Sequence, residues 1–125
     1  MGYINRFIEG IPYSKAKTRG DREAANRWTE AIKRQTKSLP RLKHACMMKV
    51  TFILPANKFP ADLPYGSDLD NLLKRFLDAL KDTIFSEVPG GDSCVVAITV
   101  MKTRALSSKE HGAHFEILPV QTIPS

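Results

Sequence analysis

The stretch that decides the fold of this chain is Ser67-Asp68-Leu69-Asp70-Asn71-Leu72-Leu73-Lys74-Arg75-Phe76-Leu77-Asp78-Ala79-Leu80. Its apolar residues recur at the spacing of one buried helical face. Together with one residue further on, they are Leu69, Leu72, Leu73, Phe76, Leu77, Leu80 and Ile84. The pattern predicts an amphipathic helix that runs to about Phe85 and packs against a core, so that its first turn is held rigidly.

The start of this helix combines two carboxylates, an amide and a lysine. In the ordinary interpretation, Ser67 and Asp70 form a capping box, and acids in the first turn complement the helix dipole. Capping does not require Asn71 and Lys74 directly after the acids, however. It also leaves unexplained Asp92, an acid in the loop before the next strand.

The acids also suit a metal site. Asp68 and Asp70 are two residues apart, and extended geometry at the helix entrance places both side chains on one side. If the next strand lies beside the helix start, Asp92 joins them. Oxygen ligands of this kind suit Mg²⁺, which favours metal-assisted hydrolysis of a phosphodiester. We therefore expect the three carboxylates to converge. Lys74 is placed to contact the scissile phosphate or the attacking water, and Asn71 to orient a carboxylate.

Length and charge narrow the possibilities further. The chain has 125 residues and a formal net charge of +6, which predicts one domain over residues 1–125. Excess positive charge favours an anionic partner such as nucleic acid, although solubility alone is a second explanation. No apolar run approaches the ~20 residues that span a membrane. The N-terminus has no signal-peptide core, so we expect a cytoplasmic protein.

Hydrophobic patterns and turn residues predict four strands and two helices in the order β-α-β-α-β-β. The strands are predicted at residues 6–11, 46–54, 94–103 and 113–120, and the helices at residues 21–38 and from about 68 to 85. Residues 46–54 are expected to form a central strand. The order indicates an α+β fold with a mixed sheet and both helices packed on one face.

Two basic segments are candidates for contact with a DNA backbone. In residues 14–20 the cations Lys15, Lys17 and Arg19 occupy every second position, so they share one face if the segment is extended. The helix predicted at residues 21–38 carries further cations around a thin apolar face. For each segment, a phosphate-contacting surface and an ordinary solvated surface are both open interpretations.

The two cysteines, Cys46 and Cys94, lie in or near two of the predicted strands. A structural zinc site usually has four Cys or His ligands at tight spacings, and the chain has no C-x-x-C pair. We therefore expect two buried free thiols.

Three segments of the chain resemble the motifs of the RusA-type Holliday-junction endonuclease family. They are Asp68-Leu69-Asp70-Asn71-Leu72-Leu73-Lys74, Asp78-Ala79-Leu80, and Gly91-Asp92-Ser93-Cys94-Val95-Val96. The resemblance covers roughly residues 58–100. It implies that Asp68, Asp70 and Asp92 bind the metal and that Lys74 is needed for cleavage. It also implies a homodimer that acts on four-way DNA junctions with Mg²⁺ or Mn²⁺.

The chain departs from the family pattern in three places. Gly91 stands where the family often has a second Asp or an Asn, which leaves one fewer possible ligand. Gly66-Ser67 stands where some members have basic residues. The N-terminal arm is only loosely similar to the family's Pro/Lys/Arg-rich arm, through Pro12, Lys15, Lys17 and Arg19. Cleavage of phosphodiesters is therefore expected more firmly than selection of junctions.

Two functions were compared on these residues. The first is a DNA endonuclease that resolves four-way junctions, with Lys15, Lys17, Arg19 and Lys74 on the DNA. The alternative is a catalytically silent nucleic-acid-binding protein on the same scaffold. A module that only binds gains nothing from acids that repel the phosphate backbone, so the carboxylates favour the enzyme.

A homodimer is expected on separate grounds. Resolving a four-way junction takes two cuts at symmetry-related positions, whereas one compact domain with one carboxylate cluster makes one cut. Two copies related by a two-fold axis supply both. The predicted strands at residues 46–54 and 94–103 are also apolar enough for both faces to be covered. With only two helices available, a partner subunit is expected to cover what remains.

Overall fold

The computed structural model describes residues 3–13, 22–58, 68–107 and 110–120. The described elements are β1 (Ile4–Glu9), α1 (Arg22–Thr36), β2 (Cys46–Leu54), α2 (Leu69–Leu80), β3 (Val95–Arg104) and β4 (Gly112–Pro119), with the short 3₁₀ turns η1 (Ala56–Lys58) and η2 (Gly91–Cys94). The predicted α+β fold and its β-α-β-α-β-β order are confirmed. Neither described α-helix is long and apolar enough to cross a membrane.

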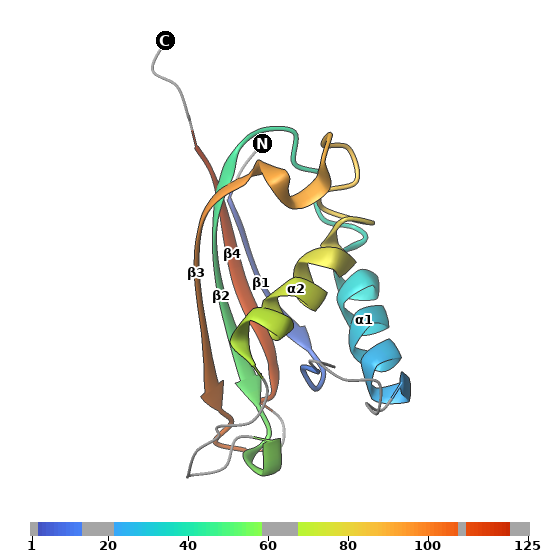
Figure 1. Ribbon diagram of the computed structural model, residues 1–125, viewed down its shortest axis with the longest axis vertical. Coiled ribbons are helices and arrows are strands. Elements are labelled where there is room, and N and C mark those ends of the chain that lie inside the picture. The colour runs from blue at the N-terminus through green and yellow to red at the C-terminus, as the bar shows by residue number, and fades with distance from the viewer. Residues whose placement is uncertain (1–2, 14–21, 59–67, 108–109, 121–125) are drawn as a thin grey trace.

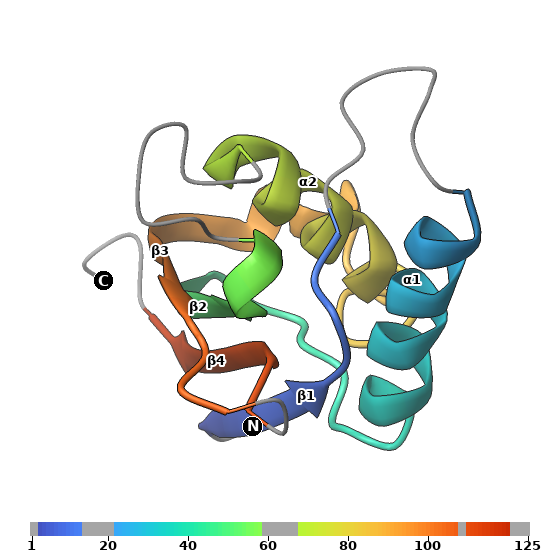
Figure 2. The ribbon, with the colours of Figure 1, turned by 90° about the horizontal axis from the view of Figure 1, so that it is seen from below.

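The four strands form one mixed sheet in the order β1-β4-β2-β3. β4 pairs antiparallel with both β1 and β2, whereas β2 and β3 pair in parallel. A parallel pair needs a crossover connection, and α2 lies in that crossover. Figures 1 and 2 show both α-helices on the same side of the sheet, as predicted. The prediction of a central strand at residues 46–54 is also confirmed.

The core lies between this sheet and the two helices. β2 alternates strictly, and its buried residues Cys46, Met48, Val50, Phe52 and Leu54 are at most 3% exposed. From the helix side, the ring of Phe76 in α2 packs edge-on against Phe52, at 5.6 Å between centroids, and against Phe115 of β4, at 5.5 Å. Leu72, Phe76, Leu80 and Ile84 are fully buried, so the predicted apolar stripe is the face that fastens α2 to the sheet.

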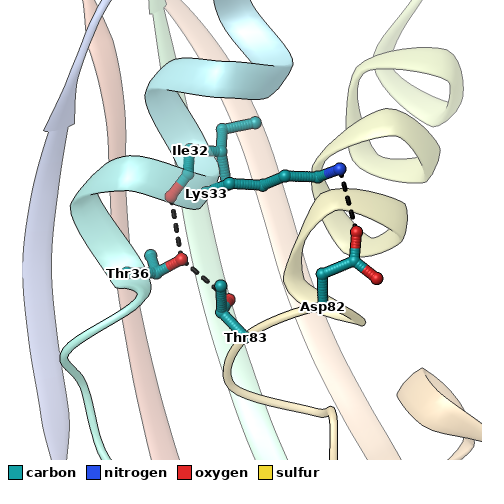
Figure 3. Close-up of polar contacts among 5 residues, drawn as sticks. All are labelled: Ile32, Lys33, Thr36, Asp82 and Thr83. Carbon is teal, nitrogen blue, oxygen red and sulfur yellow. Dashed lines mark hydrogen bonds and ion pairs between the residues drawn. The ribbon is translucent and has the colours of Figure 1, made fainter.

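The end of α2 differs from the prediction. The helix stops at Leu80 rather than near Phe85, and a series of turns follows. Figure 3 shows the contact at this point: Thr83 is buried against the end of α1, with its hydroxyl 2.8 Å from that of Thr36. The Thr36 hydroxyl donates to the carbonyl of Ile32, so Thr83 must be the donor between the two threonines. Continuing the helix would break this buried contact.

Strand β1 is also shifted from its prediction, since it spans Ile4–Glu9 rather than residues 6–11. Gly10 has a φ of 149°, and a Cβ there would lie 3.0 Å from the ring of Trp28. The strand therefore ends where the chain must pass close to a buried tryptophan, a constraint that only glycine meets easily.

Strand β3 is an edge strand with little cover. None of its ten residues is fully buried, and Val96, Ile98 and Met101 are exposed apolar residues. No described segment pairs with its outer edge. The opposite edge of the sheet is partly covered, because the Gln35 side chain of α1 bonds both the N–H and the carbonyl of Glu9 in β1.

Candidate active site

Asp68 occupies the N-cap position of α2 without acting as a side-chain cap. Its backbone is extended, with φ −64° and ψ 135°, and its side chain makes no capping hydrogen bond. Its carbonyl accepts the first helical bond, from the N–H of Leu72 at 3.0 Å. The predicted cap, Ser67, lies outside the described residues. The carboxylate of Asp68 is thus exposed and is not used to start the helix.

Asn71 links the two acids at the helix start. Its Nδ2 donates to Oδ2 of Asp68 at 3.4 Å, and its backbone N–H donates to Oδ1 of Asp70 at 2.9 Å. This agrees with the prediction that the Asn71 amide orients a carboxylate. Neither acid forms an ion pair with a cation in the described part of the chain. Two exposed carboxylates therefore stand side by side with free oxygen atoms.

Lys74 lies one helical turn after Asp70 and is exposed. In the alternative interpretation it would pair with Asp70 or Asp78, four residues away in either direction. Asp78 instead pairs with Lys81, at 3.2 Å between Nζ and Oδ1. Within the described ranges no ion pair of Lys74 is found, so its ammonium is free to meet an anionic ligand.

Asp92 lies away from these residues, which corrects the prediction of a convergent triad. It belongs to η2, and Gly91 and Asp92 adjoin Lys81, the residue that ends α2. The pKa of Lys81 is raised by its bond to Asp78 and by the charge of Asp92. A helix of 12 residues is about 18 Å long. Figure 1 shows the start of α2 and η2 at opposite ends of the sheet.

The reason for this arrangement is the direction of α2. The crossover carries α2 back along the sheet, so the connection to β3 leaves from the far end of the helix. The prediction assumed that β3 begins beside the start of α2, whereas it ends there (Figure 1).

The donors fit a hard cation in number and type, although not as a triad within one chain. No three Asp, Glu, His or Cys side chains of the described residues lie close enough together to hold a metal ion. Asp68 and Asp70 alone offer paired oxygen ligands. Mg²⁺ is commonly bound by one or two carboxylates, several waters and the phosphate oxygens of the substrate, so the pair suits it.

The cysteines play no part in this arrangement. Both are free thiols, and Cys46 is fully buried as predicted, whereas Cys94 is half-buried. Burial raises the pKa of the Cys46 thiol to about 12, with the neighbouring Cys94 as a smaller cause. Burial also raises the pKa of Cys94. The two thiols are therefore poorly reactive packing groups, Cys46 at the start of β2 and Cys94 at the end of η2.

The predicted basic arm, with Lys15, Lys17 and Arg19, lies outside the described residues. Of the α1 cations, Arg27 pairs with Glu23 at 3.5 Å and Lys33 pairs with Asp82 at 2.8 Å. Sequence reasoning missed a groove beside the site, which includes Arg75. The signal was present, because Asn71, Lys74 and Arg75 share a helical face by their spacing.

The chain is a small basic α+β protein with two exposed carboxylates at the start of α2. A comparison with known families identifies the class: the model of the endodeoxyribonuclease RusA family matches residues 11–112. The chain therefore belongs to the RusA endodeoxyribonuclease family, and it is a hydrolase that resolves Holliday junctions. The alternative of a silent binding protein is set aside. No curated protein matches the chain significantly.

Proposed function

We propose that this enzyme cleaves four-way DNA junctions with Mg²⁺, or Mn²⁺ in its place, bound by Asp68, Asp70 and Asp92. In this proposal Lys74 faces the scissile phosphate. The observation that carries it is the helix start, where Asn71 joins two exposed carboxylates that form no ion pair with a described cation. They stand one turn from a lysine that also lacks an ion pair among the described residues. An ordinary helix cap does not require two carboxylates, an amide and a lysine together.

Each residue of the helix start has a separate role in this proposal. Bound Mg²⁺ supplies an activated water and stabilises charge on the phosphate and the leaving oxygen. Asp68 and Asp70 hold the ion, and the Asn71 amide fixes the orientation of the Asp68 carboxylate. The Lys74 ammonium stabilises the negative charge that develops on the phosphate. Because the buried face of α2 is locked to the sheet, these side chains need little reorganisation during the reaction.

The enzyme works as a two-fold homodimer in this account. Two symmetric cuts require two sites, and closed two-fold dimers are the commonest oligomers. The open edge of β3 offers the surface, because an exposed edge with apolar side chains is a template for pairing with another strand. About a two-fold axis, β3 pairs antiparallel with its own copy and extends the sheet across both subunits.

Such a dimer also gives Asp92 its role. Asp92 precedes β3, and the start of α2 lies near the end of β3 (Figure 1). Antiparallel pairing brings the beginning of one β3 to the end of the other. Asp92 of the partner subunit then approaches Asp68 and Asp70, and each dimer contains two composite sites. Within one chain, the described residues supply no third carboxylate at the helix start, and this proposal explains how the site is completed.

The proposal includes the surroundings of the site. Lys15, Lys17 and Arg19 contact the DNA backbone on the face that carries the two sites, and Lys74 adds to that surface. The enzyme acts in the cytoplasm, with bacterial or phage DNA.

A synthetic four-way junction with one labelled strand tests the function directly. Incubation with Mg²⁺ should yield two nicked duplexes through paired cuts, whereas EDTA should abolish cleavage and a linear duplex of the same sequence should remain intact. Binding of the junction without cleavage in either Mg²⁺ or Mn²⁺ would contradict the proposal.

A further inference from the structure

A polar groove runs between the two helices, next to the helix start that carries Asp68 and Asp70. Its volume is about 490 Å³, and its lining includes Thr29 and Lys33 of α1 and Asn71, Lys74 and Arg75 of α2. Figure 2 shows the two helices side by side on the sheet. Asn71 belongs to both the groove and the candidate site, so the two are continuous.

The ion pairs around the groove leave two cations free. Lys33 pairs with Asp82 at 2.8 Å, and that hydrogen bond raises its pKa (Figure 3). Asp78 pairs with Lys81. Lys74 and Arg75 form no ion pair with any described carboxylate, so the groove has positive charge that the described residues do not neutralise.

Of these two cations, Arg75 has the less usual surroundings for a charged side chain. Its Nε is buried and has no hydrogen-bond partner among the described residues. Its guanidinium carbon lies 6.0 Å from the centre of the Tyr13 ring, a cation–π distance that holds the side chain in place. A buried donor without a partner is costly. Because Arg75 also lines the groove, an oxyanion there would meet its guanidinium group.

We propose that the groove between α1 and α2 binds a second phosphate of the cleaved strand, one that flanks the scissile phosphate, and that Arg75 is its main contact. This inference rests on the proposed function and extends it. Guanidinium groups bind phosphate oxygens through two parallel hydrogen bonds, which suits a fixed Arg better than a flexible lysine. With Lys74 on the scissile phosphate, Arg75 sets how the strand enters the site.

The contact with Tyr13 places Arg75 beside the end of the first described segment. Tyr13, which contacts Arg75, is the last described residue before positions 14–21. A phosphate held by Arg75 therefore lies near Tyr13. Because Asn71 lines the groove and also bonds Asp68, the groove adjoins the candidate site, which favours a bound strand over a small free anion.

The test uses Arg75→Met and Arg75→Lys, with Arg34→Met as the matched control. Arg34 is an exposed arginine of α1 that does not line the groove. Junction binding is measured in EDTA over a range of salt concentrations. Arg75→Met should weaken binding about tenfold and lower the salt slope by about one, whereas Arg34→Met should leave the affinity nearly unchanged. Arg75→Lys should recover the salt slope but only part of the affinity.

A second measurement locates the contact. Methylphosphonates replace the flanking phosphates of the wild-type cut site one at a time. One of these should weaken binding by the wild-type protein about tenfold and have no effect on Arg75→Met. If every methylphosphonate affects both proteins equally, the inference is wrong. Cleavage of the unmodified junction in Mg²⁺ by the wild-type protein is scored separately, because its absence counts against the proposed function alone. If Arg75→Met does not fold, Arg75→Lys and its response to the same scan decide the matter.

Discussion

In the proposed function, Asp70 places a negative charge where the DNA backbone approaches, which is unfavourable for binding and useful for holding a cation. We predict that Asp70→Asn abolishes cleavage while junction binding survives or tightens, because one source of repulsion is gone. A mobility-shift assay beside a cleavage assay measures both. If the residue only starts the helix, both activities should fall together with the folded population, at a cost of about 1 kcal/mol.

Lys74 is expected to matter for rate rather than for stability. As an exposed residue with no ion pair in the described part of the chain, it contributes little to folding. Lys74→Ala should therefore lower the cleavage rate at saturating junction by at least about tenfold, a loss of roughly 1.4 kcal/mol of transition-state stabilisation. Its melting temperature should change little. Lys49→Ala, an exposed lysine of β2, is the control. A Lys74→Ala enzyme with normal turnover would contradict the assigned role.

At the residue scale, the sequence correctly predicts which residues of the helix start lie close together. Asp68, Asp70, Asn71 and Lys74 lie within two helical turns, so helix geometry alone brings them together. Which residues lie near Asp92 depends on the end of the sheet at which the chain passes from α2 to β3. The local sequence pattern does not determine that position. The sequence also did not show that Arg75 lacks an ion pair among the described residues, because this depends on Asp78 pairing with Lys81.

Among the elements, α2 depends most on one residue. The Phe76 ring contacts aromatic rings from two strands and is fully buried. Phe76→Ala should lower the free energy of unfolding by about 3–5 kcal/mol, because it leaves a cavity between the helix and the sheet. Leu77→Ala, at a half-buried position on the same helix, should cost clearly less. Urea unfolding of the two variants checks the difference.

Strand β2 contains a group that makes stability depend on alkaline pH. Burial raises the pKa of Cys46 to about 12 from an ordinary value of 9.0. Below pH 9 the thiol is neutral in both folded and unfolded protein. Above pH 9 the unfolded chain loses the proton first, so folding stability falls as the pH rises from 9 toward 12. When the pH is raised from 8 to 10.5, the free energy of unfolding, measured with urea, should fall further for the wild-type protein than for Cys46→Ala. Parallel losses in the two proteins would contradict this.

Element types were predicted more accurately than element ends. β2 was predicted to the residue, because strict alternation starts at Cys46 and Pro55 stops it. The helical pattern around Leu80 continues through Ile84, yet the helix ends earlier. The cause is a buried partner, Thr36, in another helix, and periodicity carries no information about such a partner.

For the whole molecule, the exposed edge of β3 is expected to be the dimer interface. Ile98 is 37% exposed on this strand, whereas Leu118 is 43% exposed on the interior strand β4. Ile98→Asp should produce a monomer at micromolar concentration, because symmetric pairing brings like charges close together across the axis. It should also lose junction cleavage. Leu118→Asp should remain dimeric. Sedimentation velocity distinguishes these outcomes. If Ile98→Asp is still a dimer, the interface lies on another surface.

Strand order and the unpaired edge could not be predicted from the sequence. The residues of β3 from Val95 to Val100 are as apolar as those of a covered strand, and we expected a partner on those grounds. Which edge stays open depends on the pairing of β4 with both β1 and β2, and the β1 pairing joins residues as far apart in the sequence as Ile4 and Ile117. Pairings over such distances are set by the global packing of the chain.

The composite site is tested most directly by mixing two inactive chains. Asp70→Asn and Asp92→Asn are co-expressed with different tags, and the heterodimer is purified through both. Each homodimer should be inactive. The heterodimer should nick the junction, because one of its two sites combines the intact Asp68 and Asp70 of one chain with the intact Asp92 of the other. A heterodimer of wild-type and Asp70→Asn chains sets the activity expected from one site. An inactive mixed heterodimer, beside an active control, would mean that Asp92 of one chain does not complete the site of the other and would contradict this account.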